Sequence, residues 1–318
     1  MKSLQTTRFH ELRFKKFAWF VLAFNVLVIL WGAFVRATGS GAGCGGNWPL
    51  CYGDVVPLSP TSETLIEYTH RVTSGLALLF TLALLYLSRN FASGHKVRKA
   101  AIASGLFILI EALIGAGLVL FDLVGGNTSA TRALAAAVHL SNTYFLLGAL
   151  TLTALWAHDS RAAFKRPGRL RWALILVALL GLIVIGATGA ITALGDTLFP
   201  ARSLAEGLAD KFDSTAHFLV RLRVIHPLIA ILVGAYILFG IRLDYFVDQD
   251  VSNTRVRRVL IGLIVVQWIA GVINVVLLAP VWMQILHLLI ADLIWIFFII
   301  YLERGIFIRS RVSREQSL

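Results

Sequence analysis

Long runs of apolar residues alternate with short polar segments along the whole chain. A helix needs about 20 apolar residues to cross the hydrocarbon core of a bilayer. The pattern therefore predicts an all-α integral membrane protein with eight transmembrane helices. The predicted spans lie at about 17–36, 67–88, 99–121, 133–157, 172–194, 218–241, 259–279 and 284–303.

The composition supports a membrane class. Hydrophobic residues make up 58% of the 318 residues and charged residues 14%, whereas a soluble domain carries about 25% charged residues. The first run, at 17–36, is followed by no small-residue cleavage pattern, so we expect a retained helix rather than a signal peptide.

Basic residues orient the predicted helices. Of the 29 Lys and Arg residues, 22 fall in five segments: 1–16, 89–99, 158–171, 242–258 and 304–318. Positive loops stay on the cytoplasmic side, which places both termini in the cytoplasm. The net charge of +12 is thereby explained by topology, and nucleic acid is not an expected partner.

The two halves of the chain share a pattern. His226 follows the register of His70, and Gln267 stands 41 residues after His226, as Glu111 does after His70. Four spans return the chain to its starting side, so the repeat is parallel. We expect two pseudo-symmetric four-helix bundles, at 17–157 and 172–303, joined by a basic cytoplasmic linker at 158–171 and flanked by a segment at 1–16 and a tail at 304–318.

Four histidines lie near the outer ends of even-numbered spans, at equivalent points of the two halves: His70, His139, His226 and His287. Ionisable groups inside spans are rare and usually functional, and imidazole is a common axial ligand of haem iron. The sequence predicts two haem sites, His70 with His139 and His226 with His287. A proton relay and structural polar contacts are the alternatives. His217 also lies near the outer face but does not fit the repeat register.

Arginines near these outer ends are candidate partners for haem propionates, because guanidinium pairs with carboxylate through two hydrogen bonds. The candidates are Arg71, Arg132, Arg221 and Arg223. Snorkelling to the membrane interface is the alternative for each.

Glu67 precedes His70 by three residues, so the two share a helix face. The matching position before His226 is Arg223. The asymmetry predicts one catalytic site, with Glu67 as its acid or base, and one electron-transfer or structural site. A capping or interfacial glutamate is the alternative.

Cys44 and Cys51 lie in the Gly-rich segment between the first two spans, on the predicted outer face. Thiols are oxidised outside the cytoplasm, which favours a disulfide. Free thiols are the alternative, and two soft ligands alone make a poor metal site.

The stretch GAFVRATGSGAGCGGNWPLC, followed by EYTHR, AVHLSNT and the later HP and LHLL histidines, resembles the haem A synthase family. The resemblance implies oxidation of the C8 methyl of haem O to a formyl group by successive hydroxylation, giving haem A for terminal oxidases. It implies that His70 and His139 bind the substrate haem, that His226 and His287 hold haem b, and that Glu67 is catalytic.

The resemblance also implies partners and a location. They are haem O synthase as substrate donor, terminal oxidase assembly, membrane lipid, and a plasma membrane with the haem sites toward its outer face; a homo-oligomer is compatible with it. The segment before the sixth span lacks the second cysteine pair of some bacterial members. A bis-histidine electron-transfer protein without catalysis is the main alternative. A transporter would need broken polar helices, and a prenyltransferase would need aspartate-rich loops.

Overall fold

The computed structural model describes residues 2–158, 163–164, 167–210, 212–243 and 254–308. Its long helices are α1 (Lys2–Ala37), α2 (Ser62–Leu87), α3 (Lys96–Leu120), α4 (Ala130–His158), α5 (Arg169–Leu198), α8 (Ile225–Arg242), α9 (Thr254–Val276) and α10 (Val281–Ile306). Two short helices, α6 (Leu204–Ala209) and α7 (Phe218–Arg221), precede α8, and the two-residue strands β1 (Ala163–Phe164) and β2 (Phe307–Ile308) pair antiparallel.

The predicted all-α class with eight spans is confirmed. Eight helical segments of the described chain are long and apolar enough to cross a bilayer. Large apolar side chains such as Leu79, Leu113 and Val272 are each more than 60% exposed on these helices, as a lipid-facing surface requires. The chain is therefore a multi-pass membrane protein. Parts of the predicted linker and tail, at 159–162, 165–166 and 309–318, lie outside the described residues.

The predicted first and sixth spans fall within the apolar segments Leu12–Ala37 and Phe218–Arg242, and the structure adds detail to both. The helix that contains the first span begins at Lys2, because no glycine or proline interrupts the chain before Gly32. The predicted segment at 1–16 is therefore largely helical. The sixth span is broken into α7, a 3-10 turn at Leu222–Val224 and α8. His217 caps α7, since its Nδ1 accepts a hydrogen bond from the backbone N–H of Leu219, and it stands before the long helix that carries His226.

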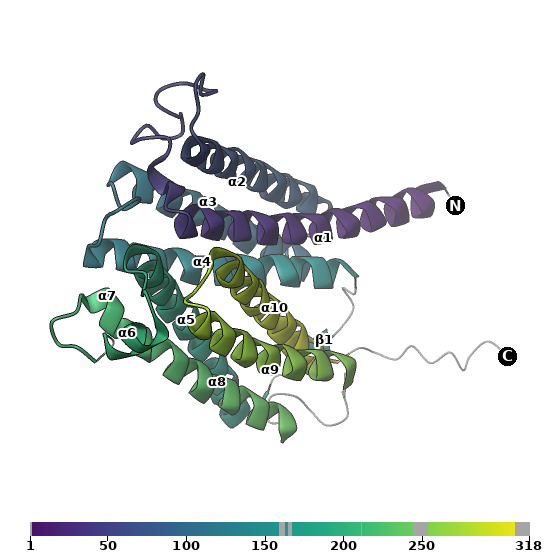
Figure 1. The fold of residues 1–318 in the computed structure, drawn as a ribbon. Coiled ribbons are helices and arrows are strands. Elements are labelled where there is room, and N and C mark those ends of the chain that lie inside the picture. The colour runs from purple at the N-terminus through teal and green to yellow at the C-terminus, as the bar shows by residue number, and fades with distance from the viewer. Residues whose placement is uncertain (1, 159–162, 165–166, 211, 244–253, 309–318) are drawn as a thin grey trace.

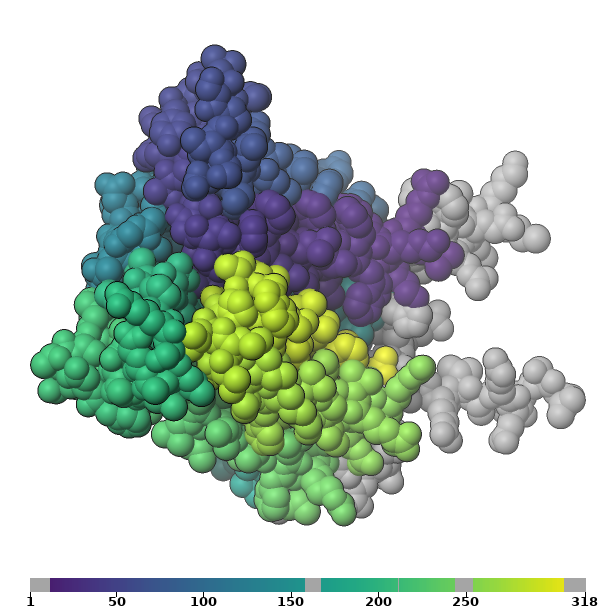
Figure 2. Space-filling view, in the orientation of Figure 1, coloured from purple at the N-terminus to yellow at the C-terminus, as the bar shows by residue number. Residues whose placement is uncertain are grey.

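The long helices form two neighbouring groups. In Figure 1, α1, α2 and α3 lie on one side of α4, and α5, α8, α9 and α10 lie on the other. The segment between α1 and α2 and the helices α6 and α7 gather at one end, opposite the start of α1. The space-filling view shows the purple and blue helices in direct contact with the green and yellow ones (Figure 2).

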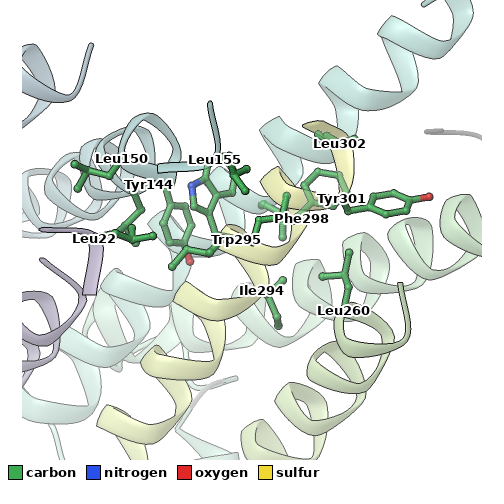
Figure 3. Packing of buried hydrophobic residues seen from close by; sticks show 14 of the residues in the cluster. Leu22, Tyr144, Leu150, Leu155, Leu260, Ile294, Trp295, Phe298, Tyr301 and Leu302 are labelled. Carbon is green, nitrogen blue, oxygen red and sulfur yellow. The ribbon is translucent and has the colours of Figure 1, made fainter. Parts of the chain in front are cut away.

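Aromatic packing on α4 and α10 holds the two groups together. Tyr144 of α4 stacks on Trp295 of α10, with ring centroids 5.1 Å apart and planes within 12°, and both rings are buried (Figure 3). Gly186 of α5 leaves room for Tyr144, because a Cβ there would lie 2.6 Å from the ring atom Cε2. This close approach lets three helices meet at one point.

A polar contact also links the groups, at the C-terminal end of α1. The guanidinium of Arg36 on α1 donates to the carbonyl of Ala193 at 2.7 Å and to the hydroxyl of Thr197 at 2.8 Å, both on α5. It donates as well to the side-chain oxygen of Gln284 on α10 at 2.9 Å. A charge in a membrane protein is tolerated where such partners surround it.

Gly186→Ala should destabilise the protein. Its Cβ would clash with the buried ring of Tyr144, which Trp295 prevents from moving, and overpacking of this kind costs about 1–3 kcal/mol. Gly262→Ala on α9 is the matched control, since a Cβ there meets no atom within 4 Å and alanine favours a helix by about 1 kcal/mol. Thermal unfolding in detergent should show a lower midpoint for the first variant alone. Equal midpoints would contradict the packing described.

Candidate functional site

Each of the four predicted histidines lies against a glycine of the long helix that precedes its own. A Cβ on that glycine would lie 2.9 to 4.0 Å from the ring carbon Cε1. All four rings are partly exposed, so each keeps an open side. The contacts are Gly32 with His70, Gly115 with His139, Gly189 with His226, and Gly271 with His287.

His226 and His287 face each other across the second group of helices. Their ring centroids are 6.3 Å apart, with an angle of 79° between the planes. A metal bound by two imidazoles lies about 2 Å from each nitrogen, which places the ring centres roughly 6 Å apart. The spacing of this pair therefore fits a shared iron. A hydroxyl of Thr188 lies 3.3 Å from Nδ1 of His226.

His70 and His139 occupy the corresponding places in the first group, each beside a glycine of the preceding long helix. The hydroxyl of Ser74 is 3.5 Å from Nδ1 of His70. Nδ1 of His139 is buried, 3.4 Å from a carboxylate oxygen of Glu111, although the side chain as a whole is 31% exposed. The open part of this ring is therefore the side away from Glu111.

Glu67 is buried, and its side chain is turned toward the segment between α1 and α2. Its Oε2 accepts from the backbone N–H of Cys44 at 2.8 Å, and its Oε1 accepts from two nitrogens of Arg71 at 3.1 and 2.5 Å. Helical spacing places Glu67 about one turn from His70, as predicted. In the described residues, however, its carboxylate contacts Arg71 and the backbone of Cys44 and makes no hydrogen bond with the ring of His70.

The predicted disulfide between Cys44 and Cys51 is confirmed, and both cysteines are buried. Arg71 holds the segment that they close by donating to the carbonyls of Gly45, Asn47 and Leu50 at 3.4, 2.7 and 2.5 Å. The disulfide loop, residues 44–51, is thus fixed to α2 by the hydrogen bonds that Arg71 and Glu67 make with its backbone.

The other arginines proposed for propionates make protein contacts of their own. Arg132 donates to the carbonyls of Gly125 and Asn127 at 2.5 and 2.7 Å. Arg223 donates to the carbonyls of Gly195 and Phe199 and pairs with Asp196 at 2.9 Å. These contacts tie the segment between α3 and α4 to α4, and the 3-10 turn before α8 to the C-terminal end of α5. A propionate role for these residues, for Arg71 and for Arg221 stays a prediction.

Glu111 is the site residue whose importance the sequence pattern understated. The pattern gave it only a place in the repeat, whereas in the structure its carboxylate accepts hydrogen bonds from Asn142 and Thr143, each at 2.5 Å. The same carboxylate also lies beside His139. The sequence contains a signal that could have predicted this polar cluster: Asn142 and Thr143 follow His139 by three and four residues and so share its helix face.

Comparison with known proteins gives two kinds of match. A family described as COX15-CtaA, cytochrome oxidase assembly protein, matches residues 15–299. A "Protoheme IX farnesyltransferase" of Thermus thermophilus is 51% identical over 302 residues, which cover 92% of this chain and 49% of that protein. The chain thus spans about half the length of this relative.

Relatives named "Heme A synthase" match over shorter stretches. The protein of Halalkalibacterium halodurans is 45% identical over 98 residues, which cover 30% of this chain and 33% of the relative. The protein of Alkalihalophilus pseudofirmus is 37% identical over 136 residues, which cover 42% and 43%.

Arg71→Gln should loosen the disulfide loop and expose its sulfurs. Hydrogen bonds to a charged group contribute about 1.5–3 kcal/mol each, and 1.4 kcal/mol is tenfold in an equilibrium. We therefore expect reduction of Cys44–Cys51 to be at least about tenfold faster. Timed reduction followed by alkylation and mass measurement tests this. Arg89→Gln, at the other end of α2, should react like the wild type, and an unchanged rate in Arg71→Gln would contradict the assigned contacts.

Proposed function

The chain belongs to the COX15-CtaA family of cytochrome oxidase assembly proteins, and we propose that it oxidises the C8 methyl group of haem O to a formyl group, producing haem A for terminal oxidases. The observation that carries this proposal is the pair of facing histidines with a ring separation of 6.3 Å, set in a fold with an equivalent pair beside carboxylates. Relatives named for haem A synthesis support it.

The two halves would divide the work. We assign His70 and His139 to the substrate haem, and His226 and His287 to a resident haem b that passes electrons. The carboxylates support this division, since Glu67 and Glu111 both belong to the first half, whereas the matching positions hold Arg223 and Gln267. A bound haem b would supply one-electron chemistry. For iron to reach Nε2 of His287, the amide of Gln267, now 3.1 Å from that nitrogen, must move aside.

Glu67 is the proposed catalytic carboxylate. Conversion of a methyl to a formyl group is a four-electron oxidation that releases protons, and a carboxylate beside the substrate can accept them. Arg71 and the backbone N–H of Cys44 hold the carboxylate of Glu67 in place by hydrogen bonding. Closure of the disulfide loop over α2 would keep bulk water from this edge of the site.

The location and partners follow from the same proposal. Both termini would lie in the cytoplasm and the histidine pairs near the outer face of the plasma membrane. The Thermus relative is named for farnesyl transfer to protohaem IX, a reaction that supplies haem O. We infer that haem O synthase delivers the substrate and that a terminal oxidase under assembly receives the product.

Glu67→Ala should stop haem A formation and leave haem O or a hydroxylated intermediate in the protein. The protein is expressed with a source of haem O, and its haems are extracted and separated by chromatography. Glu63→Ala is the control, because Glu63 is exposed on the first turn of the same helix and should leave haem A formation intact. If the wild type contains only haem b and leaves haem O unchanged, electron transfer without catalysis becomes the better explanation.

Gly189→Ala should weaken haem binding in the second half. Its Cβ would lie 3.0 Å from Cε1 of His226 and displace the ring. A clash of about 1–3 kcal/mol lowers affinity roughly 10- to 100-fold. The haem-to-protein ratio of the purified variant measures the loss. Gly75→Ala on α2 meets no atom within 4 Å and should retain full haem, and equal ratios would count against the second site.

A further inference from the structure

We propose that Glu111 is a positioning residue, which fixes the imidazole of His139 and gives the first haem site a stronger preference for ferric iron than the second. The second site has the neutral Gln267 at the equivalent place. This inference rests on the proposed haem sites and explains how one duplicated scaffold gives them different redox properties.

Glu111 and the glycine that contacts His139 act from one face of α3. They are four residues apart, and so about one helical turn. Oε1 of Glu111 lies 3.4 Å from Nδ1 of the ring, and a Cβ on Gly115 would lie 4.0 Å from Cε1. The ring is thus bounded on two edges by the same helix. Its Nε2 has no hydrogen-bond partner among the described residues, which leaves it for iron.

The surroundings of Glu111 are built for an anion. Nδ2 of Asn142 donates to Oε2 at 2.5 Å, and the hydroxyl of Thr143 donates to Oε1 at 2.5 Å. Both donors are buried and come from α4, the helix that carries His139. The carboxylate is thus held by two side-chain donors from α4, with the ring nitrogen Nδ1 of His139 at 3.4 Å.

The second half has an uncharged residue at the equivalent position, and that residue lies beside the other ring nitrogen, Nε2 instead of Nδ1. Gln267 and Gly271 are again one turn apart on α9, and both contact His287, the amide Nε2 of Gln267 at 3.1 Å from the ring Nε2. The side-chain oxygen of Gln267 is buried without a hydrogen-bond partner in the described part of the chain. The positions that correspond to Asn142 and Thr143 are Ile290 and Ala291, which carry no side-chain donor.

The difference in charge has a direct consequence for iron. A carboxylate beside the non-ligating nitrogen of a histidine ligand increases the basicity of that ligand. Oε1 of Glu111 lies 3.4 Å from Nδ1 of His139, at ion-pair distance and without a hydrogen bond. A more basic ligand and a nearby negative charge both favour the higher charge of ferric iron. The neutral amide of Gln267 provides no negative charge, and it increases the basicity of a histidine ligand less than a carboxylate does. The first site should therefore have the lower reduction potential of the two.

The alternative is that Glu111 only joins α3 to α4. A clamp of this kind would affect unfolding when removed, but it would not distinguish ferric from ferrous iron. The reduction potential of a haem bound in the full chain separates the two roles.

The test uses the full-length protein loaded with protohaem as the probe, and spectroelectrochemical titration of each haem. The variants are Glu111→Gln, Glu111→Asp and the transplant Gln267→Glu with Ile290→Asn and Ala291→Thr. Glu111→Gln should raise the reduction potential of the haem bound by His139. The expected rise is about 59 mV for one electron, which is a tenfold change in the ferric-to-ferrous ratio. The other haem should be unchanged. Glu111→Asp should restore most of the shift, and the transplant should lower the potential of the second haem.

The outcomes separate the two proposals. If the wild type takes up protohaem but neither Glu111→Gln nor the transplant moves a potential, the role of Glu111 is overturned while the haem sites stand. If Glu111→Gln fails to fold or to bind haem, the transplant alone decides. If the wild type takes up no protohaem, the haem sites are wrong and this inference falls with them.

Discussion

An imidazole inside a bilayer needs a polar partner and needs space, and the arrangement of this protein follows from meeting both needs four times. Each histidine receives its space from a glycine on the preceding long helix, and each has a polar side chain beside a ring nitrogen: Ser74, Glu111, Thr188 or Gln267. Polar groups without partners are costly where water is absent. The eight helices are therefore held in register by the site as well as by apolar packing.

The disulfide loop also depends on the need of a buried polar group for hydrogen-bond partners. A buried carboxylate is stable only when its oxygens are satisfied, and Glu67 obtains its partners from Arg71 and the backbone of Cys44. Arg71 in turn satisfies three carbonyls of the loop. Glu67 is thus both the proposed catalytic group and one of the groups that hold the disulfide loop against α2. A change in the disulfide loop would reach the site through this carboxylate, without any shift of the helices.

Sequence reasoning predicted the spans and the disulfide, which the structure confirms, because hydropathy and the place of the cysteines between two spans can be read from the chain itself. The residues of the candidate site stay predictions. The sequence placed Glu67 on the face of His70 but did not predict its contact with the disulfide loop, since the direction of a side chain depends on contacts that are distant in sequence. The first helix extends beyond the predicted span, because a run of charges marks a membrane boundary and does not end a helix that lacks glycine and proline. The break before α8 was missed for a related reason: Leu222–Val224 continues the apolar pattern while its backbone tightens into a 3-10 turn.

A duplication would explain why the two proposed sites are alike, and a small number of side chains would explain how they differ. The glycine-to-histidine contacts are equivalent in both halves, so the scaffold alone would give two similar haem environments. The differences are concentrated at charged positions: Glu67 against Arg223, and Glu111 with its donors against Gln267 with Ile290 and Ala291. A charged side chain changes the energy of an iron ion or a proton several ångströms away. Replacement of one apolar side chain by another affects only the atoms that it contacts. A repeated fold can therefore acquire two chemistries through these few positions while its packing stays nearly symmetric.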